Sequence, residues 1–371
     1  MNVEISVIIP LYKGKKYLES LIAMLEVNQE YLDKHMLNKR MEVILINDAP
    51  AEIIEDTDIS SEIVPIRLLV NEENMGIHKS RIKGLEKARG QFILFLDQDD
   101  VIAKEYFYEQ LQLIGDADAV LCNGVHRENK LIYKDLEQQR EAVSRQGYYT
   151  QKTVIISPGQ VLLRRRAIPD EWKCICLAEN GSDDVLLWIL MLRNNSRFVL
   201  NPSCLYRHVE EGDNTSLNFQ SMKSSVEELM KVITNNRLLD GEELNVLVQA
   251  LKHRIDKYEK YISVLENWGT ILGNIVKLKK EKKYEKFAVY GYGVIGRKLR
   301  NDLAEAGVKI NFFIDRVSGC YRDAPCEIYP PDKVPWKADV IIITPLFDID
   351  NIKAEMEKLG SSVVLGLMEF G

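Results

Sequence analysis

Hydrophobic residues in about the first 215 positions alternate between short, almost wholly apolar runs and longer segments with helical spacing. Continuous apolar runs rich in β-branched residues are typical of strands that are buried on both faces of a parallel sheet. We interpret residues 3–10, 41–47, 66–71 and 91–96 as such strands, and residues 15–39 and 77–88 as helices between them. Strands interleaved with helices form right-handed βαβ units, so the pattern predicts an α/β domain with a parallel sheet.

The pattern becomes purely helical between residues 219 and 283. Apolar residues recur there at alternating spacings of four and three, which is typical of a helix with one continuous apolar seam. The seam consists of Leu244, Val248, Leu251, Ile255, Tyr258, Ile262 and Leu265. It packs either on neighbouring helices of the same chain or on a second copy, and the second alternative predicts a homo-oligomer. The lysine-rich residues 277–286 close the region as a solvated linker.

Residues 284–371 return to an α/β pattern, with strands over 287–290, 310–314, 339–344 and 363–367 and a helix over 297–306. A chain of 371 residues is too long for one compact domain. We therefore expect three parts: an α/β domain over residues 1–216, a helical connector or oligomerisation region over 217–283, and a small second α/β domain over 284–371.

Composition restricts the classes of protein. Apolar residues make up 46% of the chain and charged residues 28%, an ordinary globular composition that excludes wholesale disorder and fibrous architectures. Acidic residues outnumber basic ones by 56 to 49, and the net charge of −7 argues against a nucleic-acid partner. Six cysteines without a Cys-x-x-Cys pair indicate a reducing compartment. With no basic leader and no apolar stretch of about 18 residues, we expect a soluble, cytoplasmic protein without a transmembrane segment.

The strongest chemical feature is the acidic segment at residues 97–100, Asp-Gln-Asp-Asp, directly after a predicted strand. Side chains repeat with a period of two along an extended chain, so Asp97 and Asp99 point the same way. Two convergent carboxylates form a hard-oxygen site for Mg²⁺ or Mn²⁺, which substrate phosphates typically complete. The alternative is a polar turn that caps the following helix.

Four segments in this order and spacing resemble the family 2 glycosyltransferases, which have the GT-A nucleotide-diphospho-sugar transferase fold. The resemblance covers about residues 3–216 and rests on residues 6–12, residues 43–48, the Asn74, Gly76, Ser80, Arg81 and Gly84 positions, and residues 90–100. One departure is Asn47, where the family usually has the first acid of a pair. The resemblance implies a UDP-sugar donor, a glycan or glycoconjugate acceptor, and Mn²⁺ or Mg²⁺ as cofactor.

The resemblance also assigns roles to single residues. Pro10 and Tyr12 are expected to line the nucleoside pocket, Asp48 to bind the base, Arg81 to contact the nucleotide, Asp97 to approach the ribose, and Asp99 to bind the metal. His208 resembles a position that reaches the metal or the diphosphate, although a lone histidine is more often structural. Residues 211–216 resemble a loop that closes over the donor. Each of three residues also has a structural alternative: Tyr12 is an aromatic at the pocket rim, Arg81 is a solvated helix residue, and Asp48 forms a turn.

A second acidic pair, Asp183 and Asp184, precedes the apolar helix predicted over residues 185–192. In the family the second acid of this pair takes the proton of the acceptor hydroxyl, so Asp184 is the expected base, and the displacement inverts the anomeric centre. The alternative is an N-terminal helix cap, for which Ser and Asp are preferred. Residues 157–160 are expected on the acceptor side. Residues 164–166, three arginines, either meet a phosphate-bearing acceptor or end a strand in solvent.

The last α/β part contains Gly291, Gly293 and Gly296 between a strand and a helix, with Asp315 after the next strand. This is the context of a dinucleotide fingerprint, in which phosphate approaches the helix N-terminus and the acid accepts from a ribose hydroxyl. The part resembles small Rossmann-like domains attached to sugar-modifying enzymes. Two alternatives remain open for this part: it binds a second nucleotide, or it is a degenerate domain kept for assembly. A third, that the chain is an NAD-dependent dehydrogenase, is supported by the glycine segment alone.

The sequence therefore predicts an inverting, metal-dependent glycosyltransferase that moves a hexose from a UDP-sugar to a surface glycan or glycoprotein. The alternative is an assembly or sensing module with a weakened transferase core that binds nucleotides or nucleotide-sugars without chemistry. Neither the sugar nor the acceptor follows from the residues.

Overall fold

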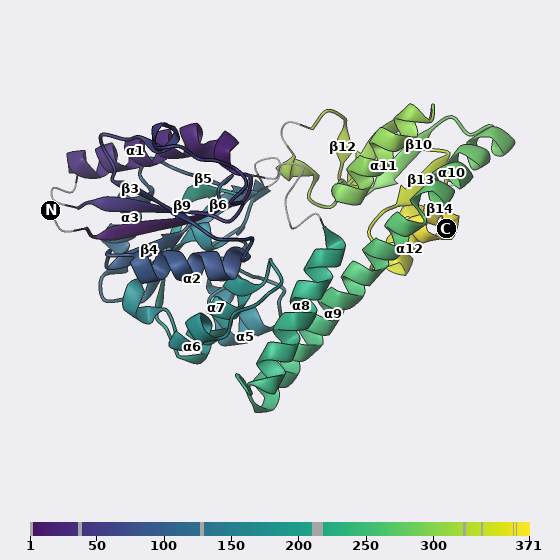
Figure 1. Cartoon of the computed structure of the whole chain (residues 1–371). Coiled ribbons are helices and arrows are strands. Elements are labelled where there is room, and N and C mark those ends of the chain that lie inside the picture. Colours follow the sequence, from purple (N-terminus) through teal and green to yellow (C-terminus); the bar gives the residue numbers. More distant parts are fainter. Residues whose placement is uncertain are drawn as a thin grey trace. The chain divides into compact units, whose positions relative to one another are not determined.

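The structure is a computed structural model that describes residues 3–35, 39–126, 130–209, 218–321, 324–334, 337–358, 360 and 362–371. The chain forms two compact units, one of residues 1–127 and 131–255 and one mainly of residues 256–371. The boundary falls within the long helix α9 (Gly241–Glu266). Figure 1 shows the two units in purple to teal and in green to yellow.

The first unit is built on a mixed sheet with the strand order β3-β2-β1-β4-β8-β6-β9-β5 and with β7 beside β6. Its strands are β1 (Ile5–Leu11), β2 (Met41–Asn47), β3 (Ile66–Val70), β4 (Phe92–Phe95), β5 (Val101–Ile102), β6 (Ala119–His126), β7 (Lys130–Leu131), β8 (Val161–Arg164) and β9 (Phe198–Arg207). Strands β1, β2, β3 and β4 pair in parallel, as the apolar runs predict, whereas β8 is antiparallel to β4 and β6.

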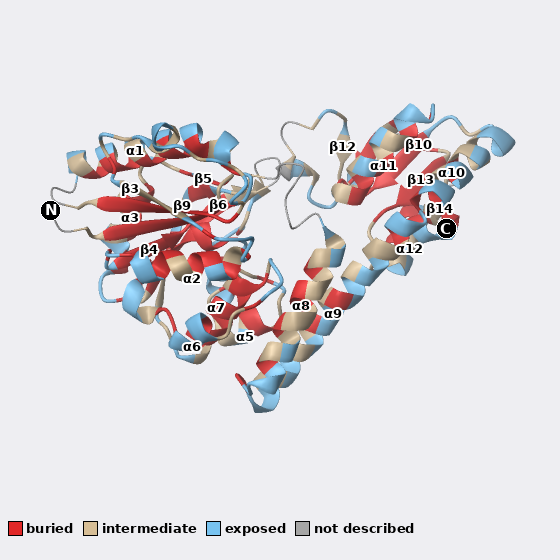
Figure 2. Cartoon of the chain, viewed as in Figure 1, coloured by how far each residue is buried: buried red, intermediate tan, exposed pale blue. Residues whose placement is uncertain are grey.

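Helices cover both faces of this sheet. Those of the first unit are α1 (Leu18–His35), α2 (Ile77–Lys87), α3 (Tyr106–Ile114), α4 (Leu136–Glu141), α5 (Arg145–Tyr149), α6 (Asp170–Cys174), α7 (Asp183–Arg193) and α8 (Phe219–Asn235). The odd-numbered residues of β1 share a buried cluster with α1 and α3, and α2 packs on β1 and β2 from the other face. Figure 2 shows the resulting buried sheet between partly exposed helices. The expected helix over 15–39 begins as a short 3-10 turn, and α1 itself starts at Leu18.

The second unit contains a smaller, wholly parallel sheet with the order β12-β11-β10-β13-β14. Its strands are β10 (Phe287–Tyr290), β11 (Ile310–Ile314), β12 (Ile328–Tyr329), β13 (Val340–Ile343) and β14 (Val363–Gly366), and its further helices are α10 (Trp268–Lys282), α11 (Val294–Glu305) and α12 (Ile349–Glu357). The predicted α/β character of this part is confirmed. Its core is separate from that of the first unit and lies between the sheet and α12.

The helical region consists of three helices, α8, α9 and α10, and the predicted seam lies within α9. The buried apolar residues of α9 are Leu247, Leu251, Ile255 and Val264, whereas Leu265 of the predicted seam is exposed. An ideal helix drifts about 20° per heptad against a 3.5-residue repeat, so a seam drawn over three heptads leaves the packed face. None of the helices in the described part of the chain is both long enough and apolar enough to cross a membrane.

Candidate active site

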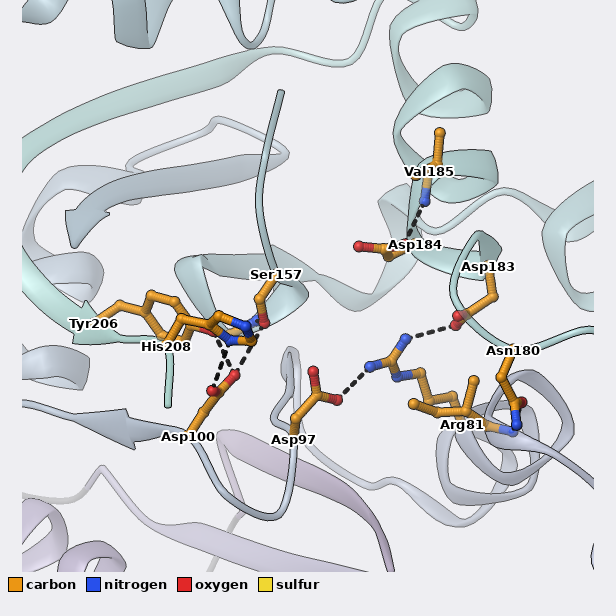
Figure 3. Close-up of polar contacts among 12 residues, drawn as sticks. Arg81, Asp97, Asp100, Ser157, Asn180, Asp183, Asp184, Val185, Tyr206 and His208 are labelled. Atoms are coloured by element: carbon orange, nitrogen blue, oxygen red, sulfur yellow. Dashed lines mark hydrogen bonds and ion pairs between the residues drawn. The ribbon is translucent and has the colours of Figure 1, made fainter. Parts of the chain in front are cut away.

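The acidic segments predicted from the sequence meet at the carboxyl end of β4, where ligands bind in open parallel sheets. Asp97 follows β4, and Asp183 and Asp184 form the first turn of α7. Arg81, on α2, lies between them (Figure 3). The site is therefore assembled from segments about 100 residues apart in sequence.

Arg81 bridges two carboxylates. Its Nη1 donates to Asp183 Oδ2 at 2.6 Å, and its Nη2 donates to Asp97 Oδ1 at 2.5 Å. Arg81 is 2% exposed, which excludes the interpretation as a solvated helix residue. Burial opposes its charge, but the carboxylates of Asp183 and Asp97 outweigh burial and raise the pKa of Arg81. Burial also disfavours the charged form of Asp97 and raises its pKa, although the positive charge of Arg81 acts in the opposite direction.

Asp184 lies beside this bridge and accepts a hydrogen bond from the Val185 amide at 2.8 Å (Figure 3). Burial, and next the charge of Asp183, raise the pKa of Asp184 to about 7. A carboxyl group with that pKa exchanges its proton near neutral pH, as a general base requires. Ser182, at the N-cap position of α7, makes no side-chain cap bond, but Asp183 and Asp184 lie in the first turn, so the capping alternative stays open.

The Asp100 carboxylate forms hydrogen bonds that connect the end of β9 to the turn that begins at Ser157. It accepts from Ser157 Oγ at 3.2 Å, from the Val209 amide at 3.2 Å and from the Tyr206 hydroxyl. His208 Nδ1 lies 3.0 Å from Asp100 Oδ1. Sequence reasoning did not assign a role to Asp100, although its place as the third acid of the segment was a visible signal.

The side chains near the Asp-x-Asp segment determine whether a divalent metal fits there. Within the residues that the structure describes, no three His, Cys, Asp or Glu side chains form a ready-made set of metal ligands. A Mg²⁺ ion that binds substrate phosphates needs only one or two carboxylates, because phosphates and water complete its shell. Burial, and then the charges of Asp100 and Asp97, raise the pKa of Asp99 to about 7. A cation relieves this crowding of negative charge, so the donor set fits a divalent metal.

The residues expected at the nucleoside end lie after β1 and β2. Tyr12 is 49% exposed, and its amide donates to Gln98 Oε1 at 3.0 Å while Gln98 Nε2 donates back to the Tyr12 carbonyl at 3.3 Å. Pro10 lies at the buried end of β1. Asp48 is buried and accepts from the amides of Met75 and Gly76 at 2.7 and 2.9 Å. Asp48 therefore fixes the turn at residues 74–76, and its expected contact with the base stays a prediction.

The three arginines lie at the other end of the sheet. Arg164 pairs with Phe92 at the start of β4, whereas Asp97 follows the end of that strand. Arg164 donates to the carbonyls of Ala117 and Gly115, and the segment lines an open cleft of about 1020 Å³. The antiparallel pairing of β8 directs its carboxyl end away from Asp184, which favours the alternative that these arginines end a strand over contact with the acceptor. The predicted donor loop, residues 211–216, lies outside the described residues.

The glycine segment of the second unit connects β10 to α11 as predicted. Gly296 approaches the Gly291 carbonyl and Thr344 too closely for a side chain, so it serves packing. Asp315 Oδ2 accepts from the Tyr292 amide and Oδ1 from the Val317 amide, both at 2.9 Å. Asp315 is thus bonded to its own chain, and Gly293, at the start of α11, faces open space.

A mixed sheet flanked by helices, with an Asp-x-Asp segment at the end of β4, defines the GT-A type of nucleotide-sugar transferase domain. Residues 6–172 match the sequence model of glycosyl transferase family 2. The N-terminal part of the chain is therefore similar to this family over less than half of the chain's length.

Two relatives that match part of the chain are also described as glycosyltransferases. EpsH of Bacillus subtilis (strain 168), described as a glycosyltransferase, is 30% identical over 123 residues, which are 32% of this chain and 33% of EpsH. TuaG of the same organism, described as a glycosyltransferase of teichuronic acid biosynthesis, is 30% identical over 112 residues, 30% of this chain and 41% of TuaG. The chain thus spans less than half of either relative. The structure of Staphylococcus aureus TarS 1–349 with UDP-GlcNAc has a TM-score of 0.49 and 20% identity, covering 68% of this chain and 72% of that one.

Proposed function

We propose that the chain is an inverting, metal-dependent glycosyltransferase that moves a hexose from a UDP-sugar to a glycan or glycoconjugate acceptor. The observation that carries this proposal is the position of Asp184 beside the bridge that Arg81 makes between Asp183 and Asp97, where burial raises the pKa of Asp184 to about 7. A base there and a diphosphate near the Asp-x-Asp segment stand on two sides of the bound sugar.

The reaction balances as a single displacement. Asp184 takes the proton of the acceptor hydroxyl, and the hydroxyl oxygen attacks the anomeric carbon. The bond from that carbon to the diphosphate oxygen breaks, and its electron pair leaves with UDP. Attack opposite to the leaving group inverts the configuration of the sugar.

The donor end of the site has its own residues. Pro10 and Tyr12 line the nucleoside pocket, Asp48 binds the base, Arg81 contacts the nucleotide, and Asp97 accepts from the ribose. Arg81 orients the Asp97 carboxylate through their 2.5 Å contact.

Asp99 and His208 would hold Mn²⁺ or Mg²⁺. The ion supplies charge neutralisation for the departing diphosphate. The contact of His208 Nδ1 with Asp100 supports this role, because ligating imidazoles are usually oriented by a carboxylate at their other nitrogen. The acceptor class is supported by the description of TuaG as a glycosyltransferase of teichuronic acid biosynthesis.

The second candidate is a nucleotide-binding assembly or sensing module. It is favoured by Asp48, whose carboxylate is engaged by amides of its own chain, and by Gly293, which faces open space at the N-terminus of α11. In this candidate Gly291, Gly293, Gly296 and Asp315 bind a second nucleotide through the open N-terminus of α11. Exposed apolar residues on α9, Val246 and Leu265, support a homo-oligomer in either candidate.

Release of UDP from a panel of UDP-hexoses, with surface-glycan acceptors and with Mn²⁺ or a chelator, separates the candidates. The transferase predicts release from one donor that stops when the metal is removed. Binding of UDP without release from any donor favours the assembly module.

A further inference from the structure

Helix α8 packs directly on the segment that leads into Asp183 and Asp184. We name this segment, residues 177–182, the base loop. The buried residues of α8 include Met222 and Ser225. The helix lies beyond residue 172, where the family match ends, and the sequence pattern assigns it to a connector.

Two polar side chains of α8 bind the base loop at its two ends. Glu228 Oε1 accepts from the Ala178 amide at 2.9 Å, and Oε2 accepts from the Glu179 amide at 2.8 Å. Ser225 Oγ donates to Ser182 Oγ at 2.8 Å, and both serines are buried. One carboxylate thus holds two consecutive amides, and a hydroxyl holds the residue before Asp183.

The base loop is shaped for this contact. Gly181 has a φ of +111°, and a Cβ there would lie 2.9 Å from Met222 Sδ, so only glycine lets the loop approach α8. The hydroxyl of Ser182 is bonded to Ser225 and leaves α7 without a side-chain cap. Helix α8 therefore takes part in fixing the residue that precedes α7.

The other side of the base loop is held by α2. Asn180 Oδ1 accepts from the Ile77 amide at 2.9 Å, and His78 Nδ1 accepts from the Leu177 amide at 3.0 Å. Helix α2 also carries Arg81, which binds Asp183. A shift of the base loop away from α8 would consequently move Asp184 relative to the Arg81 bridge.

We propose that Glu228 is a positioning residue for Asp184: its carboxylate fixes the base loop and thereby the distance of Asp184 from the bound sugar. This inference rests on the proposed function, in which Asp184 is the base. It extends the active site of the chain to α8, outside the part that matches the family.

The test compares Glu228→Gln with Glu227→Gln. In Glu228→Gln an amide NH₂ replaces one oxygen and faces a backbone donor, so one of the two loop bonds is lost. Glu227 lies on the same helix with its Oε1 3.3 Å from Lys223 Nζ, so its replacement removes the same charge without touching the base loop. Glu228→Asp keeps two acceptor oxygens and serves as the rescue variant.

We expect kcat to fall at least about ten-fold in Glu228→Gln, because a displacement of about 1 Å can cost about a hundred-fold in rate. The donor KM of Glu228→Gln should stay within about two-fold of the parent value, as should both kcat and KM of Glu227→Gln. Glu228→Asp should recover most of kcat. Amide exchange of the base loop is faster in Glu228→Gln only. Equal kcat in Glu228→Gln and Glu227→Gln would overturn the proposal.

A second pair keeps the test decisive if Glu228→Gln does not fold. Ser225→Ala, which loses the bond to Ser182, should lower kcat at unchanged KM, whereas Ser224→Ala should not, and equal values overturn the proposal. Asp184→Asn separates the two levels. If it keeps full turnover, the base assignment itself fails; if it is inactive while the Glu228 and Ser225 variants match their controls, only the positioning role fails.

Discussion

At the scale of single residues, the Arg81 bridge carries the largest energetic consequence. Asp183 is 1% exposed and its Oδ2 is bonded to Arg81. Removing one partner of a buried ion pair leaves an uncompensated charge, which costs about 3–5 kcal/mol. Arg81→Met should lower the free energy of unfolding by this amount in denaturant titrations.

The matched control is Lys79→Met, which removes a cation from the exposed face of the same helix. Exposed substitutions usually change stability by less than about 0.5 kcal/mol. Equal effects of the two variants would contradict the bridge.

The pKa of Asp184 predicts how activity depends on pH. Burial, and next Asp183, raise this pKa to about 7, and only the ionised carboxylate accepts a proton. The logarithm of kcat should therefore rise with a slope near 1 below about pH 7 and level off above it. A kcat that stays flat between about pH 5 and pH 8 would exclude Asp184 as the base.

The same pKa predicts a stability effect of Asp184→Asn. A carboxyl group whose folded pKa is raised stabilises the protein below its unfolded pKa of about 4, and this contribution is lost as pH rises through about 7. Asparagine has no such loss, so the melting temperature of Asp184→Asn should exceed that of the parent more at about pH 8 than at about pH 5. A difference that is constant with pH, or that shrinks as pH rises, would contradict the raised pKa of this carboxyl group.

At the scale of elements, Gln98 joins the turn after β4 to the turn after β1. It exchanges two hydrogen bonds with the main chain of Tyr12. We expect Gln98→Ala to raise the Kd for UDP by about three- to ten-fold, because hydrogen bonds of this kind contribute about 0.5–1.5 kcal/mol. Calorimetric titration with UDP and Mn²⁺ measures this change.

Gln91→Ala is the control for this prediction. Gln91 is exposed just before β4, at the opposite end of the strand. A Kd for UDP that rises equally in both variants would show that the two hydrogen bonds of Gln98 with the Tyr12 main chain do not shape the nucleoside pocket.

The strands and the glycine segment could be predicted because they follow local periodicity and spacing. The parallel strands β1, β2, β3 and β4 are nearly continuous apolar runs, which makes them visible without any neighbour. The contacts of Asp100 with Tyr206 and of Glu228 with Ala178 join residues 106 and 50 positions apart. Such pairings depend on how the chain returns to the sheet edge, which no periodicity encodes.

The direction of β8 is a second case. Three consecutive arginines indicate a phosphate site by composition, but the role depends on which end of the sheet they reach. Antiparallel pairing of Arg164 with Phe92 decides this, and strand direction is a property of the whole topology.

At the scale of the whole molecule, each unit has its own hydrophobic core. Phe312 is fully buried in the second unit and Phe107 in the first. Truncating a buried phenylalanine to alanine costs about 3–5 kcal/mol. Calorimetry should show Phe312→Ala lowering the unfolding transition of the second unit, with kcat and KM unchanged.

Phe107→Ala is the matched variant. It should lower the temperature at which the first unit unfolds and, with it, the temperature up to which the protein keeps its activity. The account assigns the chemistry to the first unit. Loss of transfer activity in folded Phe312→Ala would contradict this assignment.

The most direct test of the central claim is transfer by Asp184→Asn, with the exposed Asp170→Asn as control. Loss of a general base costs about 10²–10⁴-fold in rate. The account predicts a fall of that size in kcat for Asp184→Asn, while calorimetry with UDP and Mn²⁺ gives the parent Kd within about two-fold. Full turnover by Asp184→Asn, with the same donor and acceptor, would contradict it.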